Sequence, residues 1–302
     1  MIKIFDKWLP DKEKLDSGKG KKVWLTNPNN SNSCGWFKYV KKTHIKNNDE
    51  DEICTFENIS EKIAELIAKE LKLNSAKIDI GTYFGEIGCL SYNILGDRQT
   101  MAEGASYISR EYPKYDALKG IDNDTGKYYC LEIILKSLVK EELKKEFLKI
   151  MIFDFIIGNS DRHWNNWAII KTKSGKEYIS PLYDNGSSLC ALVNENEVES
   201  YLGNDKLKFA SLVDSKSKTI VRVDGNSKNI PTHKTVLHYL RDNYYEETKD
   251  FVEFAIRKLN EEKITDILRN INKYITHRRC ELLKKYLLEK IKILKEIYER
   301  GD

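Results

Sequence analysis

The sequence predicts an α+β protein with two lobes, a small lobe built on a mixed sheet in residues 21–97 and a larger, mainly helical lobe in residues 98–302. Short strand-like runs rich in Ile, Tyr and Trp fill the first third of the chain, whereas helical apolar spacing dominates the rest. With 302 residues, 40% of them hydrophobic, the chain is long enough for about two domains. Residues 1–20 end in a Lys-, Gly- and Ser-rich segment and are expected to form a loose lead-in.

The small lobe is expected to begin with a hairpin. Residues 22–26 have strand patterning, residues 27–35 form a turn-rich stretch dense in Asn, Ser and Gly, and residues 36–41 resume the strand pattern. The polar, acidic residues 47–52 are expected to form a turn before the next element.

One amphipathic helix begins at Asn58. Its apolar residues fall at helical spacing: Ile59, Ile63, Leu66, Ile67 and Leu71. Asn58 followed by Glu61 fits a capping box. Residues 76–83 and 88–95 are rich in Ile and Tyr and are predicted to add two strands to the sheet.

The larger lobe is predicted to consist mainly of helices. Residues 141–158 carry a broad apolar face, and a short hairpin follows in residues 167–171 and 177–182. From about residue 235 to the end the apolar residues return at near-helical intervals. The polar stretch 204–230 is expected to form a long mobile loop, and loops of that length are often functional.

The composition argues against several classes of partner. The net charge of +4 comes from 51 basic and 47 acidic residues, so direct binding to nucleic acid is not expected. The most apolar stretch, residues 147–158, is interrupted by Lys149 and Asp154 and is too short to span a membrane. The six cysteines lack metal-ligand and redox spacing, and the N-terminus has no apolar signal region. A cytoplasmic protein with reduced thiols is therefore expected.

Three residues with oxygen-bearing side chains, Asp161, Asn166 and Asp184, form the candidate site. The first two occur in GNSDRHWNNW at the end of a predicted helix, and the third occurs in PLYDNGSSL after the hairpin that returns the chain. Phosphoryl transfer needs a carboxylate that accepts the proton of the attacking hydroxyl, and oxygen ligands that hold Mg²⁺ against the phosphates. Four residues separate Asp161 from Asn166, as in kinase catalytic loops. Taken singly, each residue fits a turn or a helix cap equally well; their order around a hairpin favours the chemistry.

These two motifs resemble the kinase core of the HipA-like family, bacterial Ser/Thr protein kinases that are often toxins of toxin–antitoxin pairs. The resemblance is strong over residues 150–190 and looser over residues 21–97, where VWLT, GWFK, SEKIAELIAKELKL and GCLSYNIL follow the family's small lobe. It implies a bilobal protein-kinase-like fold with ATP between the lobes. Full-length HipA proteins carry an additional N-terminal subdomain, so the chain resembles a short, stand-alone version.

The resemblance implies a role for each polar residue of the two motifs. Asp161 is the catalytic base, and Asn166 and Asp184 hold Mg²⁺. His163 orients the loop or contacts the γ-phosphate, with a packed, hydrogen-bonded histidine as the alternative. Arg162 fits a structural role as well as a functional one. The Tyr-Asp-Asn-Gly step differs from the Asp-Phe-Gly of eukaryotic kinases, so their activation-loop behaviour is not carried over.

In the small lobe, the resemblance implies that Lys38 of GWFK pairs with the ATP phosphates; an exposed strand lysine is the alternative. Glu61 is the expected helix partner of Lys38, unless it serves the capping box, and Glu65 one turn further on is the substitute.

By the same resemblance, the stretch 27–35 takes the position of the loop that covers the ATP phosphates with backbone N–H groups. In the family a serine of that loop can be autophosphorylated, which ejects the loop and switches the enzyme off. Ser31 and Ser33 are the candidates, and ordinary loop serines are the alternative.

The sequence therefore predicts an ATP- and Mg²⁺-dependent phosphotransferase, in its most specific form a HipA-like protein Ser/Thr kinase. An unidentified protein is its expected substrate, and the resemblance implies an antitoxin as partner. A kinase of a small molecule or lipid headgroup is the first alternative, and a pseudokinase or binding module is the second. The stretch 204–230 separates the two kinase interpretations, because a protein kinase needs an open docking surface there and a small-molecule kinase needs a closed polar pocket.

Overall fold

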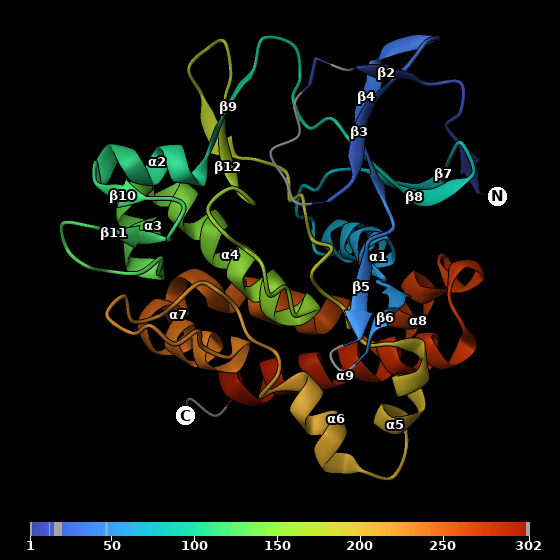
Figure 1. Cartoon of the computed structure of the whole chain (residues 1–302). Coiled ribbons are helices and arrows are strands. Elements are labelled where there is room, and N and C mark those ends of the chain that lie inside the picture. Colours follow the sequence, from blue (N-terminus) through green and yellow to red (C-terminus); the bar gives the residue numbers. More distant parts are fainter. Residues whose placement is uncertain (1, 12, 15–19, 46–47, 300–302) are drawn as a thin grey trace.

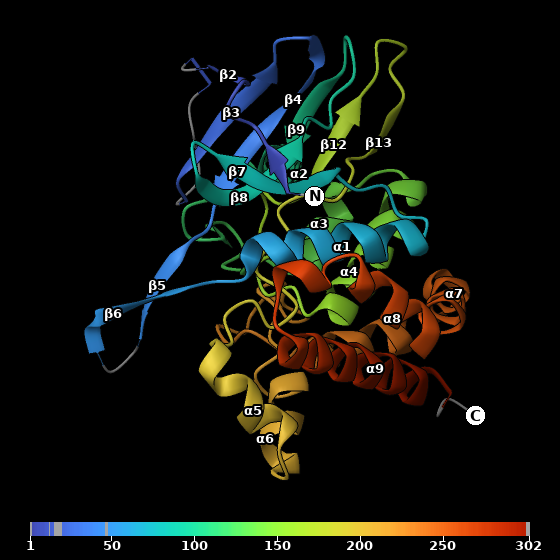
Figure 2. The ribbon, with the colours of Figure 1, turned by 90° about the vertical axis from the view of Figure 1, so that its right-hand side faces the viewer.

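The fold is the bilobal α+β arrangement that the sequence predicts. The computed structural model describes residues 2–11, 13–14, 20–45 and 48–299. A β-sheet lobe lies above a lobe made mostly of helices (Figure 1). Helix α1, Glu57–Glu70, lies between the sheet and the helices below it (Figure 2). Its buried residues, among them Ile63 and Ile67, belong to the same apolar core as the large lobe, so α1 joins the two lobes.

The small lobe is a six-stranded sheet with the order β1-β7-β8-β4-β3-β2. Its strands are β1 Lys3–Ile4, β2 Leu9–Asp11, β3 Lys22–Asn27, β4 Asn30–Tyr39, β7 Ile78–Tyr83 and β8 Glu86–Tyr92. Among the described strands of this sheet, β1 and β7 pair in parallel and the other neighbours pair antiparallel. The sequence predicts a loose lead-in for residues 1–20, but residues 3–4 and 9–11 supply the two edge strands. Phe5, which links them, is buried against Phe37.

The β3–β4 hairpin corrects the expectation of a long loop in residues 27–35. Asn27 pairs with Asn30, so only Pro28 and Asn29 form the turn. The register then shifts, because the next pair is Thr26 with Cys34, and residues 31–33 lie within that shift. The stretch is an irregular part of strand β4 rather than an open loop.

Residues 48–52 of the predicted acidic turn belong instead to a second, two-stranded sheet, and residue 47 lies outside the described residues. Strands β5 Lys42–Ile45 and β6 Asn48–Cys54 pair in an antiparallel arrangement. This hairpin projects away from the body of the protein (Figure 2).

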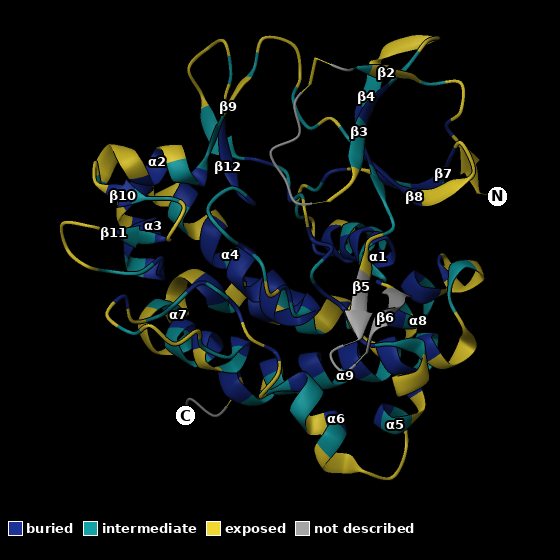
Figure 3. Ribbon diagram, viewed as in Figure 1, coloured by how far each residue is buried: buried dark blue, intermediate teal, exposed yellow. Residues whose placement is uncertain are grey.

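The large lobe is built around α4, Glu141–Ile157, which packs against α7, His233–Lys258, and α9, His277–Glu299. Figure 3 shows α4 as buried over most of its length, in agreement with the broad apolar face of its sequence. The remaining helices are α2 Gly104–Glu111, α3 Leu131–Ser137, α5 Val198–Leu202, α6 Lys206–Val213 and α8 Glu261–Arg269, with single 3-10 turns η1 Glu195–Glu197 and η2 Asn272–Tyr274. Among the residues described above, no helix is both long and apolar enough to cross a membrane.

The predicted hairpin of the large lobe is present and has a third strand. Strands β12 Ala168–Lys171 and β13 Glu177–Ile179 pair as expected, and β9 Thr100–Glu103 pairs with the other edge of β12. A further short pair joins β10 Tyr115–Asp116 to β11 Ile121–Asp122.

The stretch 204–230 is not the mobile loop that its polar composition suggests. It contains α6, and the chain beyond α6 is packed into the lobe, since Thr219 and Val221 are fully buried. The backbone N–H of Thr219 donates to the carbonyl oxygen of Pro231 over 3.1 Å. Several polar residues here bond inside the protein, among them Thr219 and Ser217, whose burial composition alone does not reveal.

Gly158 ends α4 and turns the chain towards the candidate site. Its φ of +68° and ψ of +41° lie in the left-handed region, which glycine adopts without a steric penalty. A Cβ atom at this position would lie 2.1 Å from Oη of Tyr286, whose side chain is buried. Both the backbone and the packing therefore require glycine.

We expect Gly158→Ala to lower the free energy of unfolding by about 3 kcal/mol, since left-handed strain and overpacking add. Gly126→Ala is the matched control, because its φ of +69° is nearly the same and a Cβ atom there would meet nothing within 4 Å. The control should lose only about 1 kcal/mol. Urea unfolding followed by circular dichroism measures both values, and equal losses would contradict the packing argument.

Candidate active site

The candidate site lies where two segments of the large lobe meet the small lobe. Helix α4 delivers residues 159–167, and the hairpin of β12 and β13 returns the chain to residues 182–190. The N–H of Ser160 donates to the carbonyl oxygen of Ser187 over 3.0 Å, which joins the two segments. The sequence predicts this juxtaposition, and the structure has it.

Lys38 of β4 bridges the two lobes. Its Nζ lies 2.5 Å from Oε1 of Glu61 and 2.8 Å from Oδ1 of Asp184. Burial alone would lower the pKa of Lys38, but the two carboxylates outweigh burial and hold the pKa well above its ordinary value. The lysine is therefore a fixed cation at the centre of the site.

Glu61, not Glu65, is the helix partner of Lys38. The second oxygen of Glu61 accepts the backbone N–H of Asn185 over 3.0 Å, and its side chain is only 3% exposed. Glu65 pairs with Lys62 instead. The capping-box alternative was wrong, because the N-cap of α1 is Phe56 and no side chain caps this helix end.

Asp161 has a fixed backbone and a half-exposed carboxylate. Its N–H donates to Oδ1 of Asn159 over 3.1 Å, and its carbonyl oxygen accepts Nδ2 of Asn166 over 2.7 Å. Burial raises the pKa of the carboxyl group; His163 opposes this effect and the negative charge of Asp184 adds to it. A carboxylate with a raised pKa and access to solvent suits a general base.

His163 lies beside that carboxylate. Its Nδ1 accepts the N–H of Asn165 over 3.1 Å, so the neutral ring carries its proton on Nε2. Nε2 lies 3.9 Å from Oδ2 of Asp161, and the side chain is 31% exposed. The position fits a residue that orients the loop better than a histidine buried in the core.

Asn166 and Asp184 have the chemistry of magnesium ligands. The amide of Asn166 donates through its nitrogen, which leaves its oxygen as the end suited to a metal. Lys38 lowers the pKa of Asp184 to about 2, against the opposing effect of burial, so that side chain is a carboxylate. Within the described part of the chain, no cluster of three His, Cys, Asp or Glu side chains could hold a metal by itself. Mg²⁺ would suit this pair of residues if phosphate oxygens completed its shell.

Arg162 and Asp154 form a fully buried ion pair below the site. Arg162 donates through Nε and Nη2 to both oxygens of Asp154, over 2.9 and 2.8 Å. It also donates to the carbonyl oxygen of Asn166 over 2.7 Å and to Oδ1 of Asn185 over 2.6 Å. One guanidinium therefore holds both segments of the site, a structural role for Arg162.

Asp154 was missed as a site residue, although the sequence contains a signal for it. A carboxylate inside the most apolar helix of the chain is rarely buried without a partner. Arg162, eight residues further on, is the partner.

Ser31 and Ser33 are not gathered into this cluster. Ser33 precedes Lys38 by five residues on strand β4, a distance of about 17 Å along an extended chain. Ser31 is exposed and Ser33 is half-buried. Both lie within the register shift near the tip of the β3–β4 hairpin.

Known proteins resemble this chain in sequence and in fold. A serine/threonine-protein kinase of Helicobacter pylori, CtkA, is 27% identical over 156 residues, which are 48% of this chain and 44% of that protein. The match thus spans less than half of the relative's length. The crystal structure of a proinflammatory kinase CtkA of Helicobacter pylori has a TM-score of 0.80 over 100% of both chains, with 18% identity.

A HipA chain of Shewanella oneidensis, solved with HipB and operator DNA, has a TM-score of 0.50 and 15% identity over 93% of this chain and 64% of its own. At these identities the two structures bear on the fold. The sequence itself matches the HipA-like C-terminal domain over residues 37–277, which include Lys38, Glu61, Asp161, Asn166 and Asp184. The chain belongs to the HipA-like C-terminal domain family.

Proposed function

We propose that this protein is an ATP- and Mg²⁺-dependent protein Ser/Thr kinase. The observation that carries the proposal is the bridge from Lys38 to Glu61 and Asp184, with the carboxylate of Asp161 facing the same site. This set supplies a cation for the phosphates, oxygen ligands for a metal and a base for the attacking hydroxyl.

In this proposal Lys38 binds the ATP phosphates and is kept in place by Glu61. Asp184 and Asn166 hold Mg²⁺, which neutralises the charge of the phosphates. Asp161 orients the substrate hydroxyl and accepts its proton as the hydroxyl oxygen attacks the γ-phosphorus, while ADP leaves with the electrons of the broken P–O bond. His163 lowers the pKa of Asp161 and so keeps the base ionised to lower pH.

A protein substrate is favoured over a small molecule because the curated relative is named as a serine/threonine-protein kinase. The stretch 204–230 does not decide between them, since it is packed into the large lobe. An antitoxin partner, a role as a toxin and a cytoplasmic location remain parts of the proposal. Family membership and the complex of the Shewanella HipA with HipB support an antitoxin partner.

Autophosphorylation at Ser31 or Ser33 also belongs to the proposal. Ser31 is exposed at the irregular end of β4, where a second kinase molecule could reach its hydroxyl. A phosphate there would add about two negative charges next to the tip of the hairpin.

We expect Asp161→Asn to lower kcat by about 10³-fold, because the isosteric amide cannot accept the proton. Affinity for ATP should change less than about twofold, since Lys38 and its partners are untouched. Labelled ATP with Mg²⁺ and mass spectrometry would measure turnover and locate phosphate on Ser31 or Ser33. Asp250→Asn on the exposed face of α7 is the control and should behave as the wild type. Full activity in Asp161→Asn would rule out Asp161 as the base.

We expect Asp184→Asn to weaken ATP binding in Mg²⁺ by at least about tenfold, because a ligand of the metal loses its charge. Binding without Mg²⁺ should not weaken. Titration calorimetry with and without Mg²⁺ separates the two effects. An equal loss under both conditions would mean that Asp184 acts on Lys38 rather than on a metal.

The acid limb of the kcat–pH profile should move to higher pH in His163→Gln. A base works when deprotonated, so kcat falls as the pH drops through the pKa of Asp161. His163 lowers that pKa, and its removal therefore raises the pH at which activity is lost. A limb that stays in place or moves to lower pH would show that His163 does not act on the base.

A further inference from the structure

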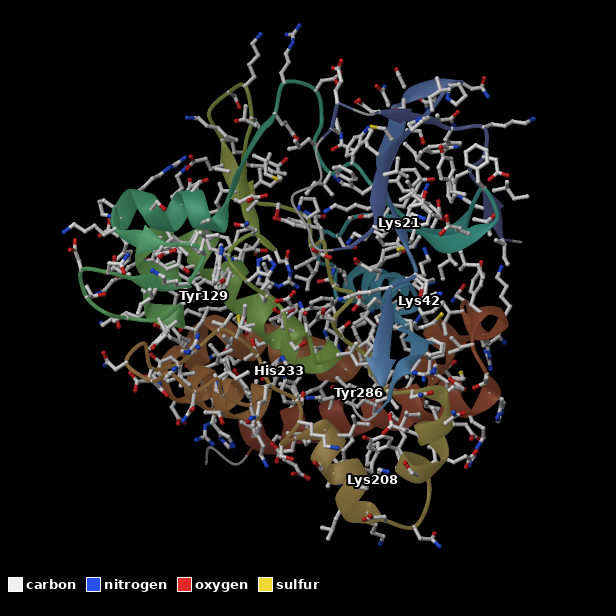
Figure 4. All side chains as sticks on the ribbon, viewed as in Figure 1. Lys21, Lys42, Tyr129, Lys208, His233 and Tyr286 are labelled. Carbon is white, nitrogen blue, oxygen red and sulfur yellow. The ribbon has the colours of Figure 1, made fainter. Side chains whose placement is uncertain are left out.

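A buried amine and a buried imidazole lie behind the candidate active site, and the proposed chemistry uses neither. Lys290 of α9 is 0% exposed and His233, the first residue of α7, is 1% exposed. Ser217, also buried, lies between them. Figure 4 labels His233 and Tyr286, which both meet the chain at the C-terminal end of α4: Tyr286 faces Gly158 and His233 bonds the carbonyl oxygen of Asn159.

The three side chains form a chain of hydrogen bonds that ends on the backbone of the site. Nζ of Lys290 lies 2.8 Å from Oγ of Ser217. Oγ of Ser217 lies 3.0 Å from Nδ1 of His233, and Nε2 of His233 lies 2.8 Å from the carbonyl oxygen of Asn159.

The last acceptor fixes the direction of every bond in this chain. A carbonyl oxygen only accepts, so Nε2 of His233 must carry the proton and Nδ1 of the neutral ring must accept. The hydroxyl of Ser217 then donates to His233 and accepts from Lys290. All three donors therefore point towards Asn159, and each of the three buried side chains has at least one hydrogen-bond partner.

Asn159 links these hydrogen bonds to Asp161. Its Nδ2 donates to Oδ1 of Asp154 over 3.2 Å, and its Oδ1 accepts the N–H of Asp161 over 3.1 Å. The carbonyl oxygen of Asn159 is thus bound by His233, while its side chain binds the backbone of Asp161. Asp161 stands only two residues from the point where the hydrogen-bond chain ends.

The charges around the chain agree with a neutral imidazole. Burial and Lys290 lower the pKa of His233 to about 3. Burial lowers the pKa of Lys290 to about 7 against the opposing effects of Cys190 and Asp214, and its Nζ lies near the rings of Phe155 and Tyr286. Nδ1 of His233 is therefore unprotonated at neutral pH and can accept from Ser217.

We propose that Lys290, Ser217 and His233 are positioning residues, which hold the backbone of Asn159 and thereby place the carboxylate of Asp161. This inference rests on the proposed role of Asp161 as the base. Lys290 lies beyond residue 277, where the match to the family ends, so family membership does not imply its role.

The test compares two substitutions of His233. His233→Gln keeps a donor for the carbonyl oxygen of Asn159, whereas His233→Phe keeps the ring and has no donor. In the Phe variant we expect kcat to fall by at least about tenfold, with KM for ATP within about twofold, because only the base is displaced. Amide exchange in residues 158–163 should become faster. The Gln variant should stay within about threefold of the wild type in kcat, with unchanged exchange.

Lys290→Met and Lys292→Met provide a second comparison on α9, should His233→Phe fail to fold. Lys292 is exposed and pairs with Glu289, so its substitution should leave kcat and exchange unchanged, while Lys290→Met should lower kcat and speed exchange in residues 158–163.

Equal kcat and equal exchange in the Phe and Gln variants, or in Lys290→Met and Lys292→Met, would overturn the inference. A wild type without phosphate transfer would overturn the proposed function instead, and the exchange comparison would still decide whether this chain of bonds holds the loop.

Discussion

The fully buried ion pair of Asp154 and Arg162 is the interaction on which the geometry of the site depends. Taking two such charges out of water costs several kcal/mol per ion, so the pair is stable only if hydrogen bonds satisfy it. Arg162 meets that condition by donating also to Asn166, Tyr183 and Asn185. The energetic requirement becomes a geometric one, because both segments of the site must lie within reach of one guanidinium. The pair therefore specifies the arrangement more than it adds stability.

A continuous series of hydrogen bonds and ion pairs, which starts at Arg162, also joins the two lobes. Asn185, held by Arg162 through its side chain, donates its N–H to Glu61, and Glu61 pairs with Lys38. Lys38 in turn neutralises Asp184. Under the proposed function, a metal-bound nucleotide would bring a cation to Asp184 and an anion to Lys38. Lys38 would then exchange the carboxylate of Asp184 for an anionic phosphate, and Asp184 would exchange the ammonium of Lys38 for a metal cation. Both side chains would stay paired with an opposite charge when the nucleotide binds.

Local patterns in the sequence predict those elements whose structure depends mainly on residues that are near in sequence. The periodicity of α1 and α4 and the spacing of Asp161 and Asn166 are such parts. Strands β1 and β2 have two and three residues and no pattern of their own; they exist because β7 and β3 offer free edges. Glu61 was ambiguous for the same reason, since a capping box is a local rule, and a partly buried lysine from strand β4 overrides it.

Helix α9 shows why a motif match over residues 150–190 does not by itself define the site. Arg279 of α9 donates to Glu195 and to the carbonyl oxygen of Val193 over 2.6 Å each, and its guanidinium lies 3.6 Å from the ring of Phe56. It thus holds the segment after Asp184 against the start of α1, while Lys290 bonds Ser217, whose partner His233 bonds Asn159. Both motif segments are thus supported by α9, whose sequence shows only helical periodicity. Which of its residues are buried against these segments cannot be inferred from that periodicity. Positional accuracy in such a site is a property of the whole lobe, since a rigid loop requires partners on every side.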